Sequence, residues 1–351
     1  MIHLGIDHHK KYCHVVALKD SGEIVWEGQV NSDREAFQEL KSLLPAGEPV
    51  QSVLEAGRNW GVLYDALEEL ELHPKLANPL KVRRIAESFV KTDKIDATVH
   101  ATLLKAGMTP AVHVPSKEVR EQRNLVRQRT WLVRMQTALK NRIHMLLDRH
   151  QFVPPVKSDL FGLMGRAWLK TVSLGTPDQW LLEQDLALLD ILKAQIRQAE
   201  RWIDQTLQSH PYFWILQSLP GIGPTLAPLI ALEVDTIERF AGVHKFVAYC
   251  GLAPSTYSSG GKTFHGKLIP TCNRQLRYAF VEAAWGAVRS SIYFSTFFKR
   301  LKYRKGPQIA IGAVARKLCE ITYFCLKNKR VYREKIYCFH AGRPGEGLAR
   351  R

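Results

Sequence analysis

Short β-type runs open the chain. Residues 2–7 are almost wholly apolar, and residues 12–18 and 24–30 are rich in β-branched and aromatic side chains. A turn signal at 20–23 separates the second run from the third. The pattern predicts three strands that follow one another as a meander.

Helical and strand patterns then alternate. The spacing Ser32-x-x-Glu35 is that of a capping box, and it predicts a helix whose apolar face carries Phe37, Leu40, Leu43 and Leu44. The pattern then predicts a strand at 50–54 that ends at Glu55, a helix near 59–70, a strand near 72–77 and helices from about 79.

This order of elements predicts an α/β domain with a mixed sheet over residues 1–110. It is also the order found in RNase H-like, or RuvC-like, folds. The fold class expected for the whole chain is therefore such a domain, followed by long helices and a mostly α C-terminal domain.

Two long helical segments form the expected second domain, residues 111–210. Residues 116–149 and 177–209 each carry an apolar stripe at helical spacing, and the first holds nine Lys and Arg against three acids. The stripes indicate an antiparallel hairpin or coiled coil. We expect this segment to serve as a dimerisation arm and, with its basic outer face, to bind nucleic acid. Packing of each helix against its own domain fits the pattern equally well.

A mostly helical third domain is expected at 211–335, before a disordered tail at 336–351. Its stretch Leu219-Pro220-Gly221-Ile222-Gly223-Pro224 resembles the turn of a helix-hairpin-helix, in which backbone N–H groups approach a phosphate. The alternative is a tight turn that only packs two helices. Residues 251–267 suggest a flexible, hydroxyl-rich basic loop without a Walker pattern.

The charge distribution points to nucleic acid. The net charge is +17, and it divides into −4 over residues 1–100 and +21 over the remainder. No apolar run is long enough for a membrane span, no signal peptide opens the chain, and the six cysteines show no CxxC pair. We therefore expect a cytoplasmic, nucleoid-associated protein with reduced thiols.

Four acidic residues lie at positions where an α/β sheet commonly forms a ligand site. Asp7 ends the first strand, Glu55 ends a later one, and Asp93 and Asp96 share one face at the start of a helix. Converging carboxylates repel one another unless a cation neutralises them, and Mg²⁺ or Mn²⁺ prefers such oxygen ligands. Each acid taken singly also has an ordinary explanation as a turn or cap residue.

The set resembles a known family. Gly5-Ile6-Asp7-x-x-Lys10, Glu55-Ala56 and Thr92-Asp93-x-x-Asp96-Ala97 are similar to the motifs of the DEDD transposases, which are insertion-sequence recombinases guided by a bridge RNA. The resemblance covers about residues 2–330. It departs after Glu55-Ala56, where the family often has Thr or Ser and then Gly but this chain has Gly57-Arg58.

The resemblance also implies a nucleophile. Gly251-Leu252-x-Pro254 followed by Ser259-Gly260 is similar to the second motif of the family, in which the serine before glycine attacks DNA and becomes phosphoseryl-linked. Ser259 takes that role, with Ser258 as the alternative. His265 is a candidate base only through its nearness in sequence, because a serine hydroxyl needs activation.

Basic residues of the third domain complete the expected nucleic-acid surface, with aromatics at 293–298 as possible stacking partners. The expected contacts are Gly221, Gly223, Lys262, Lys267, Arg274, Lys299, Arg300 and Lys302. A solvated basic face above core aromatics is the alternative.

Three functions compete. The first is a Mg²⁺-dependent DNA transposase with a serine nucleophile. Its expected partners are DNA, a structured guide RNA and further copies of the chain, in a dimer or tetramer. The second is a nuclease of the Holliday-junction-resolvase type that uses water. The third is a binding protein without catalysis, against which the complete acidic set argues.

Overall fold

The computed structural model describes residues 1–86, 92–155 and 159–334. The chain forms two compact units, Met1–Lys117 and Glu118–Arg351, which are described separately below. The division into four segments that the sequence suggests stays a prediction, and its last segment, 336–351, lies outside the described residues.

The first unit is built on a mixed sheet of five strands in the order β3-β2-β1-β4-β5. The meander is confirmed, because β1 pairs antiparallel with β2 and β2 with β3, while β4 runs parallel to β1 and β5 parallel to β4. This topology is consistent with an RNase H-like domain. The strands are β1 (Ile2–His8), β2 (Tyr12–Lys19), β3 (Ile24–Asn31), β4 (Val50–Glu55) and β5 (Pro74–Ala77).

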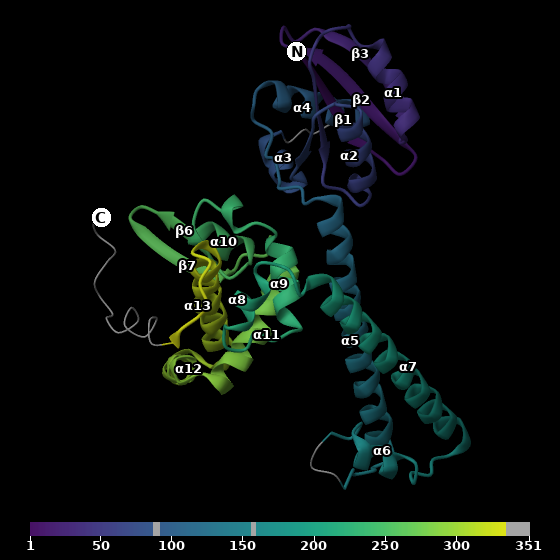
Figure 1. Ribbon diagram of the computed structural model, residues 1–351, viewed down its shortest axis with the longest axis vertical. Helices are drawn as coiled ribbons and strands as arrows, with labels where there is room; N and C mark the ends of the chain where they lie inside the picture. The colour runs from purple at the N-terminus through teal and green to yellow at the C-terminus, as the bar shows by residue number, and fades with distance from the viewer. Residues whose placement is uncertain (87–91, 156–158, 335–351) are drawn as a thin grey trace. The chain divides into compact units, whose positions relative to one another are not determined.

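Helices cover both faces of this sheet (Figure 1). One face packs its apolar side chains with α1 (Arg34–Leu43) and α2 (Trp60–Glu69). The other face packs against α3 (Pro79–Ile85) and α4 (Asp93–Lys105). The central strands are therefore buried on both sides, as their nearly continuous apolar runs require.

The start of α1 differs from the capping box that the sequence suggests. The side chain of Asp33, not Ser32, caps the helix, with Oδ1 accepting from the backbone N–H of Ala36 at 2.9 Å. The Ser32 hydroxyl instead lies 2.8 Å from Nε2 of His8. The helix begins at Arg34, so Asp33 is the residue at its N-cap, where aspartate caps as well as serine does. Leu43, expected on the apolar face, is 66% exposed.

Two long helices of the second unit run side by side, α5 (Lys117–Arg149) and α7 (Thr176–Leu207), with α6 (Leu163–Leu169) between them in the chain (Figure 1). Their apolar stripes share one core. Arg129 pairs with Glu200 at 2.7 Å and Arg142 with Asp185 at 2.9 Å, so the helices are antiparallel. The helical hairpin is confirmed, and its role in dimerisation stays a prediction.

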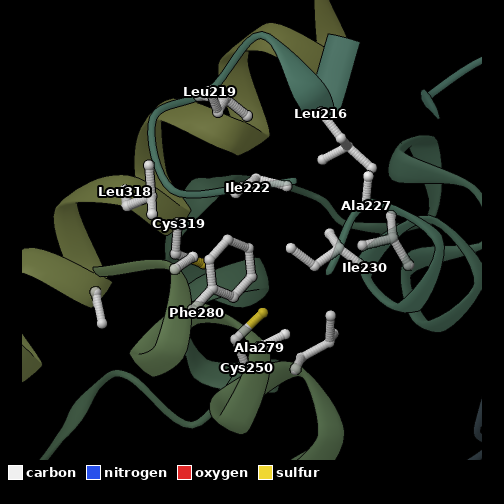
Figure 2. Close-up of a cluster of buried hydrophobic side chains, with 14 of the residues drawn as sticks. Leu216, Leu219, Ile222, Ala227, Ile230, Cys250, Ala279, Phe280, Leu318 and Cys319 are labelled. Atoms are coloured by element: carbon white, nitrogen blue, oxygen red, sulfur yellow. The ribbon is translucent and has the colours of Figure 1, made fainter. Parts of the chain in front are cut away.

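A helical bundle follows. Its large core centres on Phe280, with Leu219, Ile222 and Ile230 facing it from the segment around the glycine-rich turn (Figure 2). The elements are α8 (Phe213–Gln217), α9 (Leu226–Val234), the 3-10 helix η1 (Ile237–Arg239), α10 (Val243–Tyr249), α11 (Arg274–Ser290), α12 (Ile292–Lys305) and α13 (Pro307–Lys327).

A buried carboxylate joins α5 to the bundle. Glu233 of α9 is fully buried, and it accepts from Arg127 at 2.7 Å and from the amide of Asn273 at 2.7 Å. Arg123 donates to the backbone oxygen of Leu232 at 2.7 Å. Asn273 also caps α11 through its side-chain oxygen. These bonds satisfy a charge that would otherwise be costly to bury.

The expected flexible loop at 251–267 is instead a β-hairpin. Strands β6 (Pro254–Ser259) and β7 (Lys262–Leu268) pair antiparallel. Gly260 and Gly261 connect them with φ angles of 55° and 76°, which are left-handed values that glycine adopts without strain. A Gly-Gly pair between β-type residues is a hairpin signal, and the Ser- and Gly-rich composition hid it.

Candidate metal centre and serine-bearing hairpin

Two carboxylates emerge at neighbouring strand ends. Asp7 lies next to the end of β1, and Glu55 is the last residue of β4. The parallel pairing of these strands runs as far as Ile6 opposite Leu54, so the two acids follow at the same edge of the sheet. This is the edge where α/β sheets form their ligand sites.

The first turn of α4 supplies the other two acids. Thr92 caps this helix, with its hydroxyl oxygen accepting from the N–H of Ile95 at 3.3 Å. Asp93 and Asp96 lie in the first turn, where the helix dipole favours negative charge. Because the spacing of three keeps them on one side of the helix, both can face the sheet edge.

Gly5 allows α4 to lie directly on β1. A Cβ atom built on Gly5 would stand 1.9 Å from the backbone oxygen of Ala97 and 2.4 Å from the nitrogen of Ala101. No other residue type leaves room for the helix backbone at this distance. Gly5 therefore sets how closely the acids of α4 approach Asp7.

Asp7, His9 and Asp93 form a compact group whose ligand atoms lie within 4.8 Å of one another. Nε2 of His9 lies 3.1 Å from Oδ2 of Asp7 and 3.2 Å from Oδ2 of Asp93. The hydroxyl of Tyr12 donates to Asp93 at 3.1 Å. The sequence interpretation missed His9 and Tyr12. The only signal for His9 was its position two residues beyond Asp7, on the same side of an extended chain.

The electrostatics of Asp7 are those of a crowded acid. Burial raises the pKa of Asp7 above its ordinary value, and His9 opposes this effect. The negative charges of Asp96 and Asp93 raise the pKa of Asp7 further. A bound cation would favour the ionised form of all three carboxyls.

Glu55 and Asp96 line a cavity of about 420 Å³ beside this group. The buried His100 contributes to the same wall, with Nε2 3.6 Å from Oε1 of Glu55. Asp96 thus belongs to both parts of the site, since it lines the cavity and also acts on the pKa of Asp7.

These residues fit a divalent metal ion. The carboxylates of Asp7, Glu55, Asp93 and Asp96 are hard oxygen donors, which suit Mg²⁺ and Mn²⁺. His9 adds one nitrogen donor, and Mn²⁺ accepts such a mixed set more readily than Mg²⁺ does.

Ser259 and Ser258 lie on opposite faces of the hairpin, because side chains alternate along a strand. Ser259 is exposed and pairs with Lys262 across the turn. The Ser258 hydroxyl lies 3.2 Å from that of Thr263. His265 pairs with Thr256 through its backbone, and its side chain lies outside the described residues.

The glycine-rich turn between α8 and α9 packs closely on α11. Gly221 has φ 80°, and a Cβ there would stand 2.0 Å from the backbone oxygen of Ala283. Gly223 has open space where a Cβ would lie. Packing accounts for the glycine at 221, and a phosphate contact of either glycine stays a prediction.

The expected basic residues lie at the surface. Lys262, Lys267 and Arg274 are exposed around the hairpin, and Lys299, Arg300 and Lys302 are exposed on α12. Phe294 and Phe298 of α12 are buried in the bundle core, which leaves them unable to stack on bases. The guanidinium of Arg300 lies 5.7 Å from the ring centre of Phe297.

Comparisons with known proteins agree on a family. Residues 4–152 match a family model described as "Transposase", and residues 214–299 match one described as "Transposase IS116/IS110/IS902 family". Together the matches span more than half of the chain.

Individual relatives match most of its length. The chain is 27% identical to "Probable family 20 transposase" of Pseudomonas aeruginosa, over 94% of both chains. It is 24% identical to "Transposase for insertion sequence element IS1111A" of Coxiella burnetii, over 94% of this chain and 91% of that one. A transposase for the element IS1328 of Yersinia enterocolitica is 25% identical over 75% of this chain and 76% of its own length.

Proposed function

Since the chain belongs to the DEDD-type insertion-sequence transposases of the IS116/IS110/IS902 family, we propose that it cleaves and rejoins DNA through a serine nucleophile and a divalent metal site. Asp7, Glu55, Asp93 and Asp96 would hold the metal, which is Mg²⁺ in this proposal. The observation that carries the metal part is the meeting of two strand ends and the capped start of α4 at one sheet edge.

The chemistry is a pair of phosphoryl transfers. The Ser259 oxygen attacks the phosphorus, a bond from Oγ to phosphorus forms, and the bond from phosphorus to the leaving sugar oxygen breaks. The serine proton passes to a base and the leaving oxygen takes up a proton. A strand hydroxyl then attacks the phosphorus of the phosphoserine. The new bond from the sugar oxygen to phosphorus joins the strands, the bond from Oγ to phosphorus breaks, and Ser259 takes up a proton in place of the one that the hydroxyl loses. A divalent metal ion held by Asp7, Glu55, Asp93 and Asp96 would supply charge stabilisation for both transfers.

The choice of Ser259 over Ser258 is supported by its position. Ser259 is exposed beside the turn, on the strand face that also carries Lys262. The Ser258 hydroxyl is engaged with Thr263 on the other face. A lysine opposite the serine can hold a phosphate beside it.

The proposed substrate is DNA, and the proposed location of the protein is the cytoplasm, at the nucleoid. A structured guide RNA and further copies of the chain, as a dimer or tetramer, are proposed partners on the family resemblance. Exposed tryptophans on both long helices, Trp131 and Trp202, support an interface there. Within the described residues, no helix has the length and apolar character that a membrane crossing demands.

A resolvase-type nuclease that uses water is the second candidate. It is favoured by one observation, that the acidic set and His9 lie within the first unit alone. Such a set can activate water without any serine.

Covalent trapping distinguishes the two. The protein is incubated with Mg²⁺, DNA of its element ends and the RNA that co-purifies, and is then run on a denaturing gel. We expect a protein–DNA adduct in the wild type and in Ser258→Ala, and none in Ser259→Ala or Asp7→Ala. Strand cleavage that persists in Ser259→Ala without an adduct would establish the water-using nuclease instead.

A further inference from the structure

Two large aromatic side chains face each other across the hairpin and remain in solvent. Tyr257 of β6 and Phe264 of β7 are directly opposite in the strand register. Their exposed fractions are 75% and 66%. A cross-strand aromatic pair on a two-stranded sheet usually stabilises it by packing, but here most of the ring surface is left for a partner.

The pair lies on the same face as Ser259. Tyr257 precedes Ser259 by two residues, and side chains two apart share a strand face. On the partner strand, Phe264 and Lys262 stand opposite these two residues. One face of the hairpin thus carries a hydroxyl, a cation and two rings, while Ser258 and Thr263 bond to each other on the other face.

The charge of the surrounding chain selects the partner. Residues 239–281 contain no Asp or Glu, and four of their six Lys and Arg are exposed, namely Lys245, Lys262, Lys267 and Arg274. Such a segment is complementary to a polyanion. Exposed rings among cations are the combination that binds single-stranded nucleic acid, since every base offers a face for stacking.

The geometry also limits which nucleotide is bound. Two residues of a strand span about 7 Å, which is roughly twice the rise of 3.4 Å per base in duplex DNA. A phosphate at Ser259 therefore places the adjacent nucleotide, or the one after it, at the aromatic pair. A base can reach the rings only when it has left the duplex stack.

We propose that Tyr257 and Phe264 form a stacking platform for an unpaired DNA base next to the phosphate that Ser259 attacks. This inference rests on the proposed function for the position of the phosphate, and it adds the form of the substrate, a strand that is single-stranded at the cleavage point.

The experiment measures binding without chemistry. The full chain carries Ser259→Ala, and its affinity for a fluorescein-labelled single-stranded oligothymidine is measured by anisotropy beside a duplex and an RNA of equal length. Tyr257→Ala and Phe264→Ala should each weaken binding of the single strand about ten-fold, in line with base–aromatic stacking. Tyr257→Phe should keep the affinity, because the ring remains.

Two controls make the result specific. Tyr257→Leu retains apolar area and loses the ring, so it should bind as weakly as Tyr257→Ala. Trp214→Ala removes an aromatic of α8 that is 68% exposed and should leave the affinity unchanged. A base analogue whose fluorescence is quenched by stacking, 2-aminopurine, should be quenched by the parent protein and not by Tyr257→Ala.

Several outcomes would overturn the platform. If the two alanine variants bind the single strand as tightly as the parent protein does, the platform is refuted. If Tyr257→Leu restores the affinity that Tyr257→Ala loses, the face makes an apolar contact with protein instead. If the parent protein prefers RNA or duplex DNA to the single strand, the face belongs to those partners. Because the assay uses the serine variant, it stays independent of the adduct assay that tests the nucleophile.

Discussion

Replacing Gly5 by alanine tests how the fold builds the acidic site. The new methyl group would stand 1.9 Å from the oxygen of Ala97 and 2.4 Å from the nitrogen of Ala101. Carbon and oxygen atoms that are not bonded keep more than about 3 Å apart, so α4 must move away from β1 by roughly 1 Å or more. Overpacking of this kind costs about 1–3 kcal/mol or more, and the backbone of a helix yields less readily than a side chain.

The shift would reach the site directly, because Asp93 and Asp96 lie in the first turn of the same helix. We expect Gly5→Ala to lower the stability of the first unit by about 3 kcal/mol and to weaken Mn²⁺ binding about ten-fold or more. Hydrogen exchange of the amides of β1 and α4 reports the stability, and calorimetric titration reports the metal.

A matched control exists on β3. The atoms nearest to a Cβ on Gly28 belong to the far end of the Trp26 side chain, the closest at 2.9 Å, and that ring can turn aside. Gly28→Ala should therefore keep both the exchange rates and the metal affinity. If Gly5→Ala behaves as Gly28→Ala does, the close packing of α4 on β1 does not set the site, and the reasoning fails.

Three further predictions concern single side chains. Burial raises the pKa of Asp7, so Asp7→Asn should raise the melting temperature of the protein at neutral pH when no metal is added. This gain should disappear below about pH 3.9, where the acid is protonated in both the folded and the unfolded protein. Equal melting temperatures of variant and wild type at pH 7 would contradict this prediction. His9→Gln should remove the ¹⁴N modulation from electron spin echo spectra of bound Mn²⁺, whereas His8→Gln should keep it, since the His8 ring contacts Ser32. Glu233→Gln should lower the free energy of unfolding, measured by urea denaturation, by about 3 kcal/mol, because it breaks a buried ion pair. Glu23→Gln breaks an exposed ion pair and serves as the control. An equally small loss of stability in the two variants would refute the prediction.

The repeating patterns of the chain were sufficient for most elements. Residues 12–18 and 24–30 predict strands because they are rich in β-branched and aromatic side chains, and both strands are present. The long apolar stripes predict helices over 116–149 and 177–209 because one side of each helix must be buried, and α5 and α7 match them closely. Which side of a strand or helix is buried depends on the residues of that segment itself, so it can be predicted from the sequence.

The acids could be grouped because topology fixes where strands end. Parallel strands deliver their C-terminal residues to one edge, which brings Asp7 and Glu55 together whatever the details of packing. His9 and Tyr12 could not be found in this way. Their contacts with Asp93 join positions more than eighty residues apart, and the position of His9 two residues beyond Asp7 does not reveal that contact.

The errors came from weighing composition over geometry. The Ser- and Gly-rich stretch at 251–267 suggested a loop, although the Gly260-Gly261 pair between alternating residues specifies a hairpin. The difference matters for function. A loop would leave Ser258 and Ser259 equivalent, whereas a strand separates them onto two faces and brings the aromatic pair to the side of Ser259.

The acidic edge costs stability in the metal-free protein, and this cost is itself an argument about function. Burial and two neighbouring carboxylates raise the pKa of Asp7, which means that its charged form is disfavoured in the fold. Packing of β1 on α4 does not require an acid at position 7, since the close contact with the helix backbone is made at Gly5. A cation removes the repulsion and adds binding energy of about 2.7 kcal/mol when its concentration is a hundred times the dissociation constant. The first unit should therefore melt at a higher temperature as Mg²⁺ rises, and Asp7→Asn should abolish that dependence because it removes the charge at the centre of the site.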